Sequence, residues 1–398
     1  MISRRSLVYV GLNRWDTIWQ RSHHLAQNLS QSFRVLYVDP VAYSIPGYLR
    51  NYLKGDRSRN LPPRLRSIHP NLTVFTPPPL LPFSLDNKLI NYLDHNLLAH
   101  MVRRLLSQLD MPQPVLWLTF PVHFPLVGKL GEILVCYDCM DNYPAFYPPG
   151  TARARLAVQL EEKLLLSADL VITPALSLQN RLQEVHTNVH LVRNAVSRQF
   201  LTYQPGESGS PPADWPGEDG PVLGYMGTIA RWLDFEAIIR ISTRHPDWRI
   251  VFVGPAEIDL TAYRGLTNLH FLGPKSYDRL ADYAARFDIG LIPFLMNELT
   301  LNVNPVKIYE YFALGKPVVA TRLPELMPFS GVCYLTNSTA EFVQQVERAV
   351  EDLYLSSSVK QHEAQAQRRA IAQANTWNER TAEVLNILEA HLTSKQII

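Results

Sequence analysis

The sequence predicts an α/β protein of two doubly wound domains, each a mostly parallel sheet with helices on both faces. Short apolar runs alternate with helical patterns in two separate blocks, residues 1–200 and 220–376. Buried parallel strands read as continuous apolar runs because helices cover both faces of the sheet. The chain has 398 residues, which is more than one core usually supports at roughly 100–200 residues per domain.

The first block contains six strand-like runs separated by helical patterns. SLVYVGL is followed by a helical segment and RVLYVDP, and PVLWLTF and ILVCYD come further on. A helical segment at 153–168 then leads to DLVITP, another helix and NVHLVRN. We therefore expect residues 1–200 to form one domain.

The second block begins after residues 201–219, a segment rich in proline, glycine, serine and acidic residues that predicts an interdomain linker. Strand-like runs then alternate with helices over 220–376, from PVLGYMG to KPVVAT. A final helix, residues 377–398, is expected to return to the first domain. Two such domains imply a cleft between them, with ligands outside the carboxyl ends of the strands.

Composition narrows the class of protein. The formal net charge is +2, which argues against bulk binding of nucleic acid. Three cysteines do not form a disulfide framework, and a reducing cytoplasm fits them best. Cys136 and Cys139 form a C-x-x-C at the end of a strand, where we expect small buried residues rather than a redox pair.

No stretch reaches the ~18–20 apolar residues that cross a bilayer, so we expect a cytoplasmic protein or one on the inner face of the membrane. Residues 50–66 carry six basic residues and one acidic residue, and an apolar, proline-rich run follows. Residues 50–84 thus suit an anionic membrane surface. A long solvated loop is the alternative.

Residues 222–325 resemble the donor domain of family 4-like retaining glycosyltransferases (glycosyl transferases group 1). The strings that carry the resemblance are GYMGTIARWLDFEAI, WRIVFVGP, NLHFLGPKSYDRLADYAARFDIGLIPF and NPVKIYEYFALGKPVVATRLPEL. In the first domain, WDTIWQRSHHLA and VCYDCMDNYPAF are similar to the branch that includes teichuronic-acid-type enzymes.

The resemblance implies the GT-B fold, in which two Rossmann-like domains face a central cleft. It also implies transfer of a sugar from a nucleoside-diphosphate sugar to a glycan or lipid-linked glycan in cell-surface polysaccharide synthesis. Retention of anomeric configuration is implied as well, with the donor phosphate taking the acceptor proton.

Donor-binding candidates begin with Gly227, which follows a strand and permits the close backbone approach that a diphosphate requires. Thr228 and Arg231 lie in the same loop, and Gly273 ends another strand. Relatives commonly hold the diphosphate with an arginine and a lysine near here. Arg231 is the candidate substitute, and the alternative is a solvated loop charge.

The segment from Asn302 to Glu310 is the most informative. The helix that starts at residues 304–307 offers free N–H groups and a positive dipole end to the phosphates, near Asn304 and Lys307. The E-x7-E motif of the family ends at Glu310. The resemblance therefore implies that the Glu310 carboxylate accepts hydrogen bonds from the ribose hydroxyls of the donor. Asn302 stands where that motif has its first glutamate. The alternative for Lys307 and Glu310 is an exposed i, i+3 pair.

Catalytic candidates in the first domain are His123, Asp138 and Asp141, all after strands. His123 would face the transferring sugar, and the aspartates would orient the acceptor hydroxyl or accept its proton. Arg21 and His24 open the first helix on the acceptor side. A structural histidine, helix capping and a solvated helix face are the alternatives.

The sequence contains no metal-ligand spacing, so we expect neither metal nor other cofactor. Two rival functions remain at this stage. One is a sugar-nucleotide-modifying enzyme of the epimerase type. The other is a nucleotide-sugar-binding scaffold that has lost transfer, which Asn302 would favour.

Overall fold

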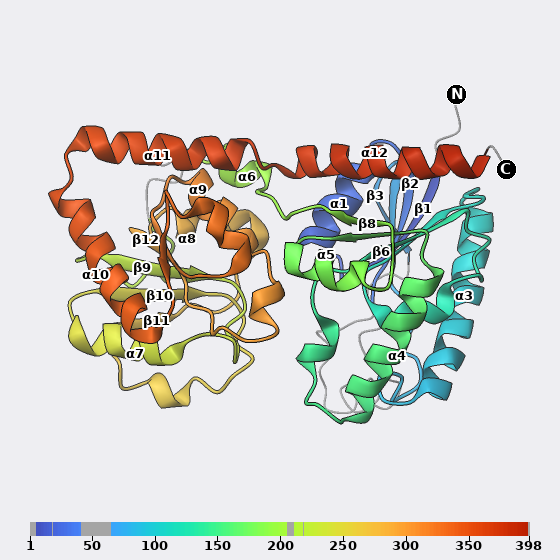
Figure 1. The fold of residues 1–398 in the computed structure, drawn as a ribbon, viewed down its shortest axis with the longest axis horizontal. Helices are drawn as coiled ribbons and strands as arrows, with labels where there is room; N and C mark the ends of the chain where they lie inside the picture. Colours follow the sequence, from blue (N-terminus) through green and yellow to red (C-terminus); the bar gives the residue numbers. More distant parts are fainter. Residues whose placement is uncertain (1–4, 18, 41–64, 205–210, 218, 397–398) are drawn as a thin grey trace. The chain divides into compact units, whose positions relative to one another are not determined.

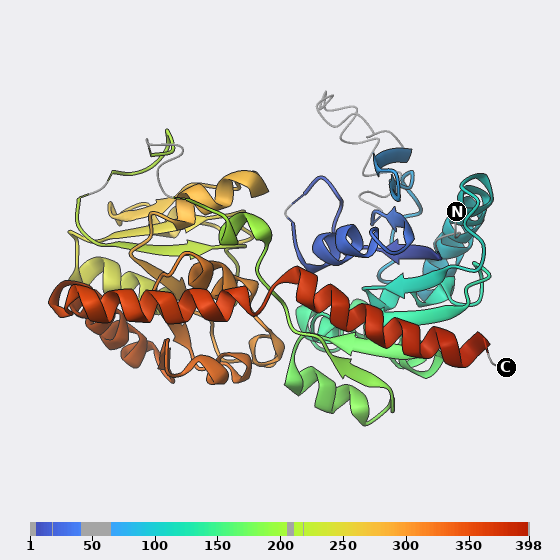
Figure 2. The ribbon, with the colours of Figure 1, turned by 90° about the horizontal axis from the view of Figure 1, so that it is seen from above.

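The computed structural model describes residues 5–17, 19–40, 65–204, 211–217 and 219–396. The chain divides into two compact units. The first is Met1–Arg193 together with Arg380–Ile398, and the second is Asn194–Glu379. Figures 1 and 2 show the two units, each built around its own sheet. The cleft expected between two such domains stays a prediction.

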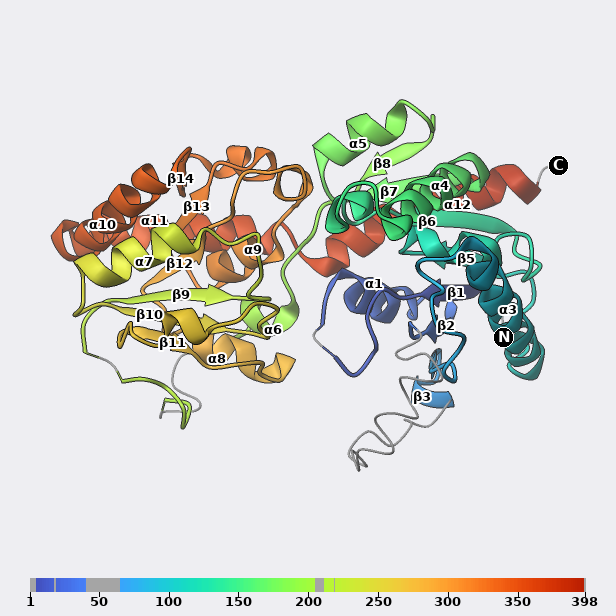
Figure 3. The ribbon, with the colours of Figure 1, turned by 90° about the horizontal axis from the view of Figure 1, so that it is seen from below.

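In its described residues the first unit contains an eight-stranded sheet in the order β3-β4-β2-β1-β5-β6-β7-β8 (Figure 3). All neighbours pair in parallel except β3 and β4, which confirms the mostly parallel sheet. The strand order reverses between β1 and β5, because the chain first adds β2 on one side and later β5 on the other. The strands are β1 (Ser6–Val10), β2 (Arg34–Val38), β3 (Leu65–His69), β4 (Leu72–Phe75), β5 (Val115–Leu118), β6 (Leu134–Asp138), β7 (Leu170–Thr173) and β8 (Val189–Leu191).

Helices of the first unit bury one apolar stripe each against this sheet. Asn87 caps α3 by accepting from the Leu89 and Ile90 amides, and Thr151 caps α4 in the same way. The α-helices are α1 (Arg21–Leu29), α3 (Lys88–Gln108), α4 (Ala152–Ser167) and α5 (Leu176–Gln183), and two short 3-10 helices are η2 (Pro121–Leu126) and η3 (Tyr143–Phe146).

The C-terminal helix α12 (Trp377–Gln396) starts in the second unit, and its residues from Arg380 onward belong to the first. Val384, Leu388 and Leu392 are buried at i, i+4 spacing. The His391 ring also lies within hydrogen-bond distance of the Asn188 amide. These contacts attach the last turns of the chain to the sheet of the first unit.

In its described residues the second unit contains a six-stranded sheet in the order β11-β10-β9-β12-β13-β14. Every neighbouring pair is parallel. The order reverses between β9 and β12, the switch point at which open α/β sheets bind ligands. The strands are β9 (Val222–Met226), β10 (Arg249–Val253), β11 (Leu269–Phe271), β12 (Ile289–Ile292), β13 (Val318–Thr321) and β14 (Tyr334–Thr336).

Helices of the second unit complete one apolar core with this sheet. Asp234 caps α7 by accepting from the Ala237 amide. The α-helices are α6 (Arg198–Leu201), α7 (Phe235–Arg244), α8 (Leu280–Ala284), α9 (Val306–Ala313), α10 (Thr339–Leu355) and α11 (Ser358–Gln373), and the 3-10 helices are η4 (Thr261–Tyr263), η5 (Tyr277–Arg279), η6 (Thr300–Asn302) and η7 (Pro324–Phe329).

The described part of the predicted linker, residues 201–219, lies inside the second unit, whose chain begins at Asn194. Trp215 stacks at 6.3 Å on Phe287, and Asp214 accepts from Lys275 at 2.6 Å. Although the segment is mostly polar, this ring contact and this ion pair attach it to the core of the second unit. Residues 205–210 and 218 lie outside the described residues.

Among the described residues, no helix is long and apolar enough to cross a membrane. Cys136, Cys139 and Cys333 are free thiols, and the first two are buried. Burial raises the pKa of the Cys136 and Cys139 thiols well above the ordinary value. These two cysteines therefore pack as small apolar residues, as the sequence predicts.

Candidate functional site

Lys307 lies at the switch point of the second sheet. Its ammonium is 5.1 Å from the ring centre of Tyr225 on β9 and 4.8 Å from that of Phe294, just after β12. Both rings hold the cation by cation–π attraction at the carboxyl ends of these two strands. The sheet thus presents a positive charge where ligands of doubly wound domains bind.

Gly227 brings the backbone of the β9 loop next to this cation. Its φ is +136°, and a Cβ at this position would lie 3.5 Å from Lys307 Nζ. A Cβ at Gly254 would lie 2.1 Å from the Gly227 carbonyl oxygen, so the loops after β9 and β10 touch. Glycine is required at both positions, which leaves bare backbone beside Lys307.

Glu310 lies one turn after Lys307 on α9, and both groups carry shifted pKa values. Burial raises the pKa of Glu310 to about 7, and Lys307 acts against this shift. Burial lowers the pKa of Lys307 to about 8, opposed by Glu310. Within the described residues, neither side chain has a hydrogen-bond partner, and buried charges without such partners are typical of binding sites.

The start of α9 also has the features that suit an anion. No side chain in the described part of the chain caps this helix, so its first amides and positive dipole end are available to a phosphate. The Asn304 side chain is hydrogen-bonded within the protein, and a phosphate contact at this position stays a prediction. This side chain accepts from the Asn194 amide at 3.1 Å and donates to Glu325 at 3.0 Å. The amide is buried in this network and ties the loop before α9 to Asn194.

The other predicted donor residues occupy separate loops of the same unit. The Thr228 carbonyl accepts from the Tyr225 hydroxyl at 2.9 Å, and Arg231 is exposed in the same loop. The Gly273 carbonyl accepts from the Gly254 amide at 3.0 Å. Asn302 donates to the Glu298 carbonyl at 2.6 Å. Thr228 and Gly273 therefore support the glycine loops around Lys307.

Arg21 and Asp138 form a buried ion pair in the first unit. The Arg21 Nε lies 3.0 and 3.1 Å from the two carboxylate oxygens, and Arg21 also donates to the Val192 carbonyl at 2.7 Å. Asp138 is fully buried and Arg21 is 3% exposed. We predicted an acceptor-side residue in Arg21 and a proton acceptor in Asp138, but these groups neutralise each other away from solvent. Their geometry fits a structural role.

Asp141 is the predicted carboxylate that stays partly exposed after β6. Burial, and next Asp138, raise its pKa to about 7. A carboxyl that titrates near neutral pH is suited to proton transfer. His24, by contrast, is buried on α1 beside Trp19, and burial lowers its pKa to about 3. His24 is therefore a neutral packing residue.

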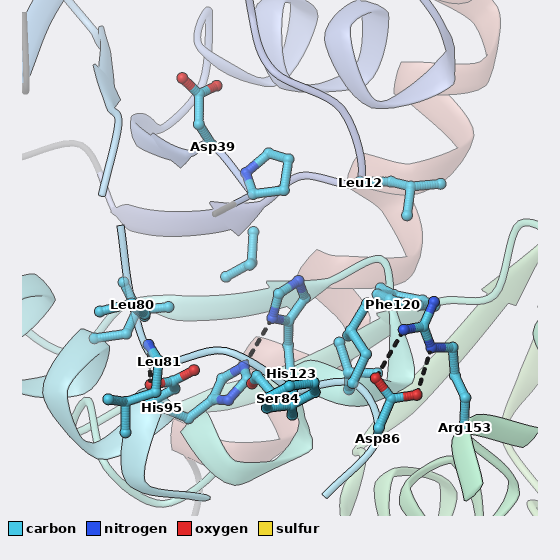
Figure 4. Close-up of a pocket in the computed structure, with 17 residues that line it drawn as sticks. Leu12, Asp39, Leu80, Leu81, Ser84, Asp86, His95, Phe120, His123 and Arg153 are labelled. Atoms are coloured by element: carbon cyan, nitrogen blue, oxygen red, sulfur yellow. Dashed lines mark hydrogen bonds and ion pairs between the residues drawn. The ribbon is translucent and has the colours of Figure 1, made fainter. Parts of the chain in front are cut away.

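His123 lies in η2, just after β5, and lines a cavity of about 300 Å³ in the first unit (Figure 4). Its Nδ1 is 3.0 Å from Nε2 of His95 on α3. Burial lowers the pKa of His123 well below its ordinary value, so the ring is neutral. His123 thus faces a cavity, as expected of a ligand-contacting residue.

Sequence reasoning missed Gly254, Tyr225 and His95. Gly254 follows a strand in WRIVFVGP, which is the same signal that singled out Gly227. Tyr225 and His95 carry no local signal, because their roles depend on residues far along the chain, Lys307 and His123. Among the described residues, no group of three or more histidine, cysteine or acidic side chains could hold a metal ion.

Comparison with solved structures places this arrangement in a known class. The chain matches sucrose-phosphate synthase from Thermosynechococcus elongatus with a TM-score of 0.73 at 13% identity, covering 98% of this chain and 100% of that chain. It matches an Escherichia coli trehalose-6-phosphate protein bound with UDP-2-fluoro glucose with a TM-score of 0.68 at 12% identity, covering 99% of each chain. Anabaena Alr3699/HepE in complex with UDP and glucose gives 0.64 at 15% identity, covering 96% of this chain and 100% of that chain. The chain therefore has the GT-B fold of two Rossmann-like domains.

A sequence match to a known family lies in the second unit. Residues 220–352, which include Gly227, Lys307 and Glu310, match the glycosyl transferases group 1 family. The chain is also 31% identical over 226 residues to TuaH of Bacillus subtilis (strain 168), a protein assigned to teichuronic acid biosynthesis as a glycosyltransferase. That match covers 52% of this chain and 55% of the relative. The family match is thus confined to residues 220–352, and the chain spans about half the length of the curated relative it matches.

Proposed function

We propose that the protein transfers a sugar from a nucleoside-diphosphate sugar to a glycan or lipid-linked glycan acceptor in cell-surface polysaccharide synthesis. The observation that carries this proposal is the Lys307–Glu310 pair beside Gly227, at the switch point of a group 1 glycosyltransferase domain. Lys307 and the start of α9 bind the diphosphate, and Glu310 accepts the ribose hydroxyls. Two structural neighbours have UDP or a UDP sugar bound, which supports uracil as the base of the donor nucleotide.

Transfer in this proposal depends on electrostatic support of the departing diphosphate. The charge that develops on the leaving phosphate is stabilised by the Lys307 ammonium and the α9 amides. The donor phosphate takes the acceptor proton, and the anomeric configuration is retained. The resemblance to family 4-like enzymes supports both statements.

A thermal-shift panel of nucleoside diphosphates and their sugars tests the donor half. A ligand that binds only the folded protein raises the melting temperature by mass action. We expect one nucleotide class to give a shift that is lost in Glu310→Ala and kept in Glu236→Ala. Glu236 is the matched control because its carboxylate is 64% exposed on α7 of the same unit. No shift with any nucleotide would contradict the donor site.

Sugar transfer is then measured with the selected radiolabelled nucleotide sugar and a lipid extract of bacterial membranes as acceptor. We expect label in the lipid fraction with wild type and Glu236→Ala, and none with Glu310→Ala. Analysis of the product by NMR gives the anomeric configuration, and inversion would contradict the retaining mechanism. Nucleotide binding without transfer to any lipid or glycan fraction would favour a nucleotide-sugar-binding scaffold.

We further propose that the first unit docks on an anionic membrane surface. One face of α3 exposes Leu89, Leu93 and Leu97 at i, i+4 spacing, with exposed fractions of 70%, 45% and 53%. Exposed Arg103 and Arg104 lie on the same helix. Leucines beside cations suit the interface of an anionic bilayer. Residues 50–64 of the basic segment identified from sequence lie outside the described residues.

Cosedimentation with vesicles of phosphatidylglycerol and phosphatidylcholine tests this surface. The triple variant Leu89→Ser, Leu93→Ser, Leu97→Ser should lose most of its vesicle binding. The control is Leu166→Ser, since Leu166 is 76% exposed on α4 of the same unit and lies outside the α3 stripe. Equal binding by the triple variant and the control would contradict the proposal.

A further inference from the structure

The cavity of the first unit lies at the switch point of its sheet. Residues that line it follow β1, β2 and β5, the strands on both sides of the β1/β5 reversal. Its volume of about 300 Å³ is at the lower end of the range for small-molecule sites. Most of its wall is apolar, with Leu80, Leu98 and Phe120 among the lining residues. All of its lining residues belong to the first unit.

Hydrogen bonds behind the cavity determine which nitrogen of His123 carries the proton. The Asn91 carbonyl can only accept, so the His95 Nδ1, 2.7 Å away, must donate. Burial lowers the pKa of His95 to about 4, so at neutral pH its Nε2 has no proton and accepts from His123 Nδ1. His123 is also neutral. Its Nε2 therefore carries a lone pair.

Figure 4 shows the His123 ring with one nitrogen bonded to His95 and the other directed away from it, towards the region of Leu12 and Asp39. Within the described residues, that second nitrogen, Nε2, has no hydrogen-bond partner. A lone pair at this position accepts a hydrogen bond from an O–H or N–H group. It repels an anionic oxygen, which has no proton to give.

Charges around the cavity favour the same kind of ligand. Three aspartates, Asp39, Asp86 and Asp94, are among the lining residues. Arg153 is the one arginine or lysine among the lining residues described, and Asp86 already binds it through two hydrogen bonds of 2.9 and 2.8 Å. Among the lining residues described, an anionic ligand would therefore meet acidic side chains and a cation that is already paired. A neutral, hydroxyl-bearing ligand meets no such penalty.

We propose that His95 is a positioning residue that holds His123 as the Nδ1–H tautomer, so that this cavity binds the acceptor through a neutral, hydroxyl-bearing part with an apolar neighbour. The acceptor hydroxyl donates to His123 Nε2, and the apolar wall packs against the rest of the group. The identification of the ligand as the acceptor rests on the proposed function. The tautomer and the preference for a neutral hydroxyl stand on the cavity alone.

The first test reads the tautomer in the wild-type full-length protein. ¹⁵N NMR of ring-labelled histidine distinguishes protonated from bare ring nitrogens. We expect His123 to show a protonated Nδ1 and a bare Nε2 at neutral pH. In His95→Ala this signature should be lost, whereas His100→Ala should keep it, because His100 is an exposed histidine on the same helix. A wild-type His123 that is protonated at Nε2 would overturn the proposal, whether or not any variant folds.

The second test measures binding of octyl β-D-glucopyranoside, below its micelle-forming concentration and without nucleotide. The fully O-methylated analogue, which has no hydroxyl, and octyl β-D-glucuronide, which is anionic, should each bind about tenfold more weakly, the effect of losing one good hydrogen bond. His123→Phe and His95→Ala should remove this preference, and His100→Ala should keep it. Equal binding of all three glycosides to wild type would overturn the proposal.

UDP binding is measured on the same samples, so that the two proposals fail separately. UDP binding together with equal affinity for the three glycosides would overturn the cavity proposal and leave the donor site intact. Glycoside preference without UDP binding would support the cavity proposal and contradict the donor site.

Discussion

The two units each contain a buried pair of opposite charges, and the pairs differ in how their hydrogen bonds are used. Arg21 and Asp138 of the first unit bind each other through the guanidinium Nε, and Arg21 also binds a backbone carbonyl. Lys307 and Glu310 of the second unit interact by charge alone within the described residues, and burial shifts both of their pKa values. The first pair is joined by hydrogen bonds within the protein, whereas the side chains of the second pair have no hydrogen-bond partner among the described residues.

The difference teaches how to separate structural from functional charges in this fold. A buried charge costs several kcal/mol unless hydrogen bonds and an opposite charge offset it. In the first unit the protein supplies both. In the second unit the phosphates and ribose of a donor would supply what is missing.

The largest effect is expected from Asp138→Ala. The substitution leaves the Arg21 guanidinium buried without its carboxylate, which costs about 3–5 kcal/mol of unfolding free energy. Urea unfolding followed by circular dichroism measures the loss. Asp86→Ala is the control, since it breaks the half-exposed Arg153 pair and should cost about 1 kcal/mol or less. Equal losses in the two variants would remove the contrast between the pairs.

Lys307→Met should affect binding more than stability. It removes the cation from beside Gly227 and should lower the affinity for UDP by about 2 kcal/mol, roughly thirtyfold, the value of a hydrogen bond to a charged group. Uridine, which has no phosphate, should bind both proteins equally. Calorimetric titration of both ligands checks this prediction. An equal loss for uridine and UDP would show that Lys307 does not contact the phosphates.

The stability of the second unit should be lowest between about pH 7 and pH 8. Burial raises the pKa of Glu310 from 4.5 to about 7, so the unfolded state loses its proton first and stability falls as pH rises over this interval. Burial lowers the pKa of Lys307 from 10.5 to about 8, so above pH 8 the unfolded state holds more protons and stability rises again.

The falling and the rising part of this pH profile can each be removed by one substitution. Glu310→Gln should flatten the profile between pH 4.5 and 7, and Lys307→Met should flatten it between pH 8 and 10.5. The expected differences from wild type are about 1–2 kcal/mol, an order-of-magnitude value. Urea unfolding of wild type and both variants at a series of pH values measures them. Parallel profiles in all three proteins would contradict the shifted pKa values.

The smallest effect is expected from Glu236→Ala, which breaks an exposed i, i+4 pair with Arg240 on α7. Such pairs contribute about 0.3–0.5 kcal/mol. Urea unfolding and UDP titration should both give values close to those of wild type. A loss above about 1 kcal/mol of unfolding free energy would mean that exposed charges also stabilise this unit. Glu236→Ala could then not serve as the reference for the buried pairs.

The sequence predicts the fold better than the site. Continuous apolar runs predict the parallel strands because a strand that is buried on both faces is apolar along its whole length. Its own residues are enough to identify it. Gly227, Lys307 and Glu310 could be selected because a glycine after a strand and a helix start are local signals. The structure places Lys307 against the loop of Gly227 and one turn before Glu310.

What the sequence could not predict depends on pairing between distant segments. Asn304 looked like a phosphate ligand, but its partner Asn194 lies 110 residues earlier. Asp138 looked like a proton acceptor, but Arg21, 117 residues away, neutralises it. The sequence did not predict a role for His95, because only the packing of α3 brings its ring next to His123. In each case the local pattern is the same for a structural and a functional residue.

The most direct test of the central claim is a double cycle of ligand and variant at Glu310. UDP and 2′-deoxy-UDP are titrated into wild type, Glu310→Ala and the control Glu236→Ala. We predict that loss of the 2′-hydroxyl weakens binding roughly tenfold in wild type and in the control, and hardly at all in Glu310→Ala, because Glu310 accepts that hydroxyl. An equal loss in all three proteins would contradict the ribose contact and the donor site built around it.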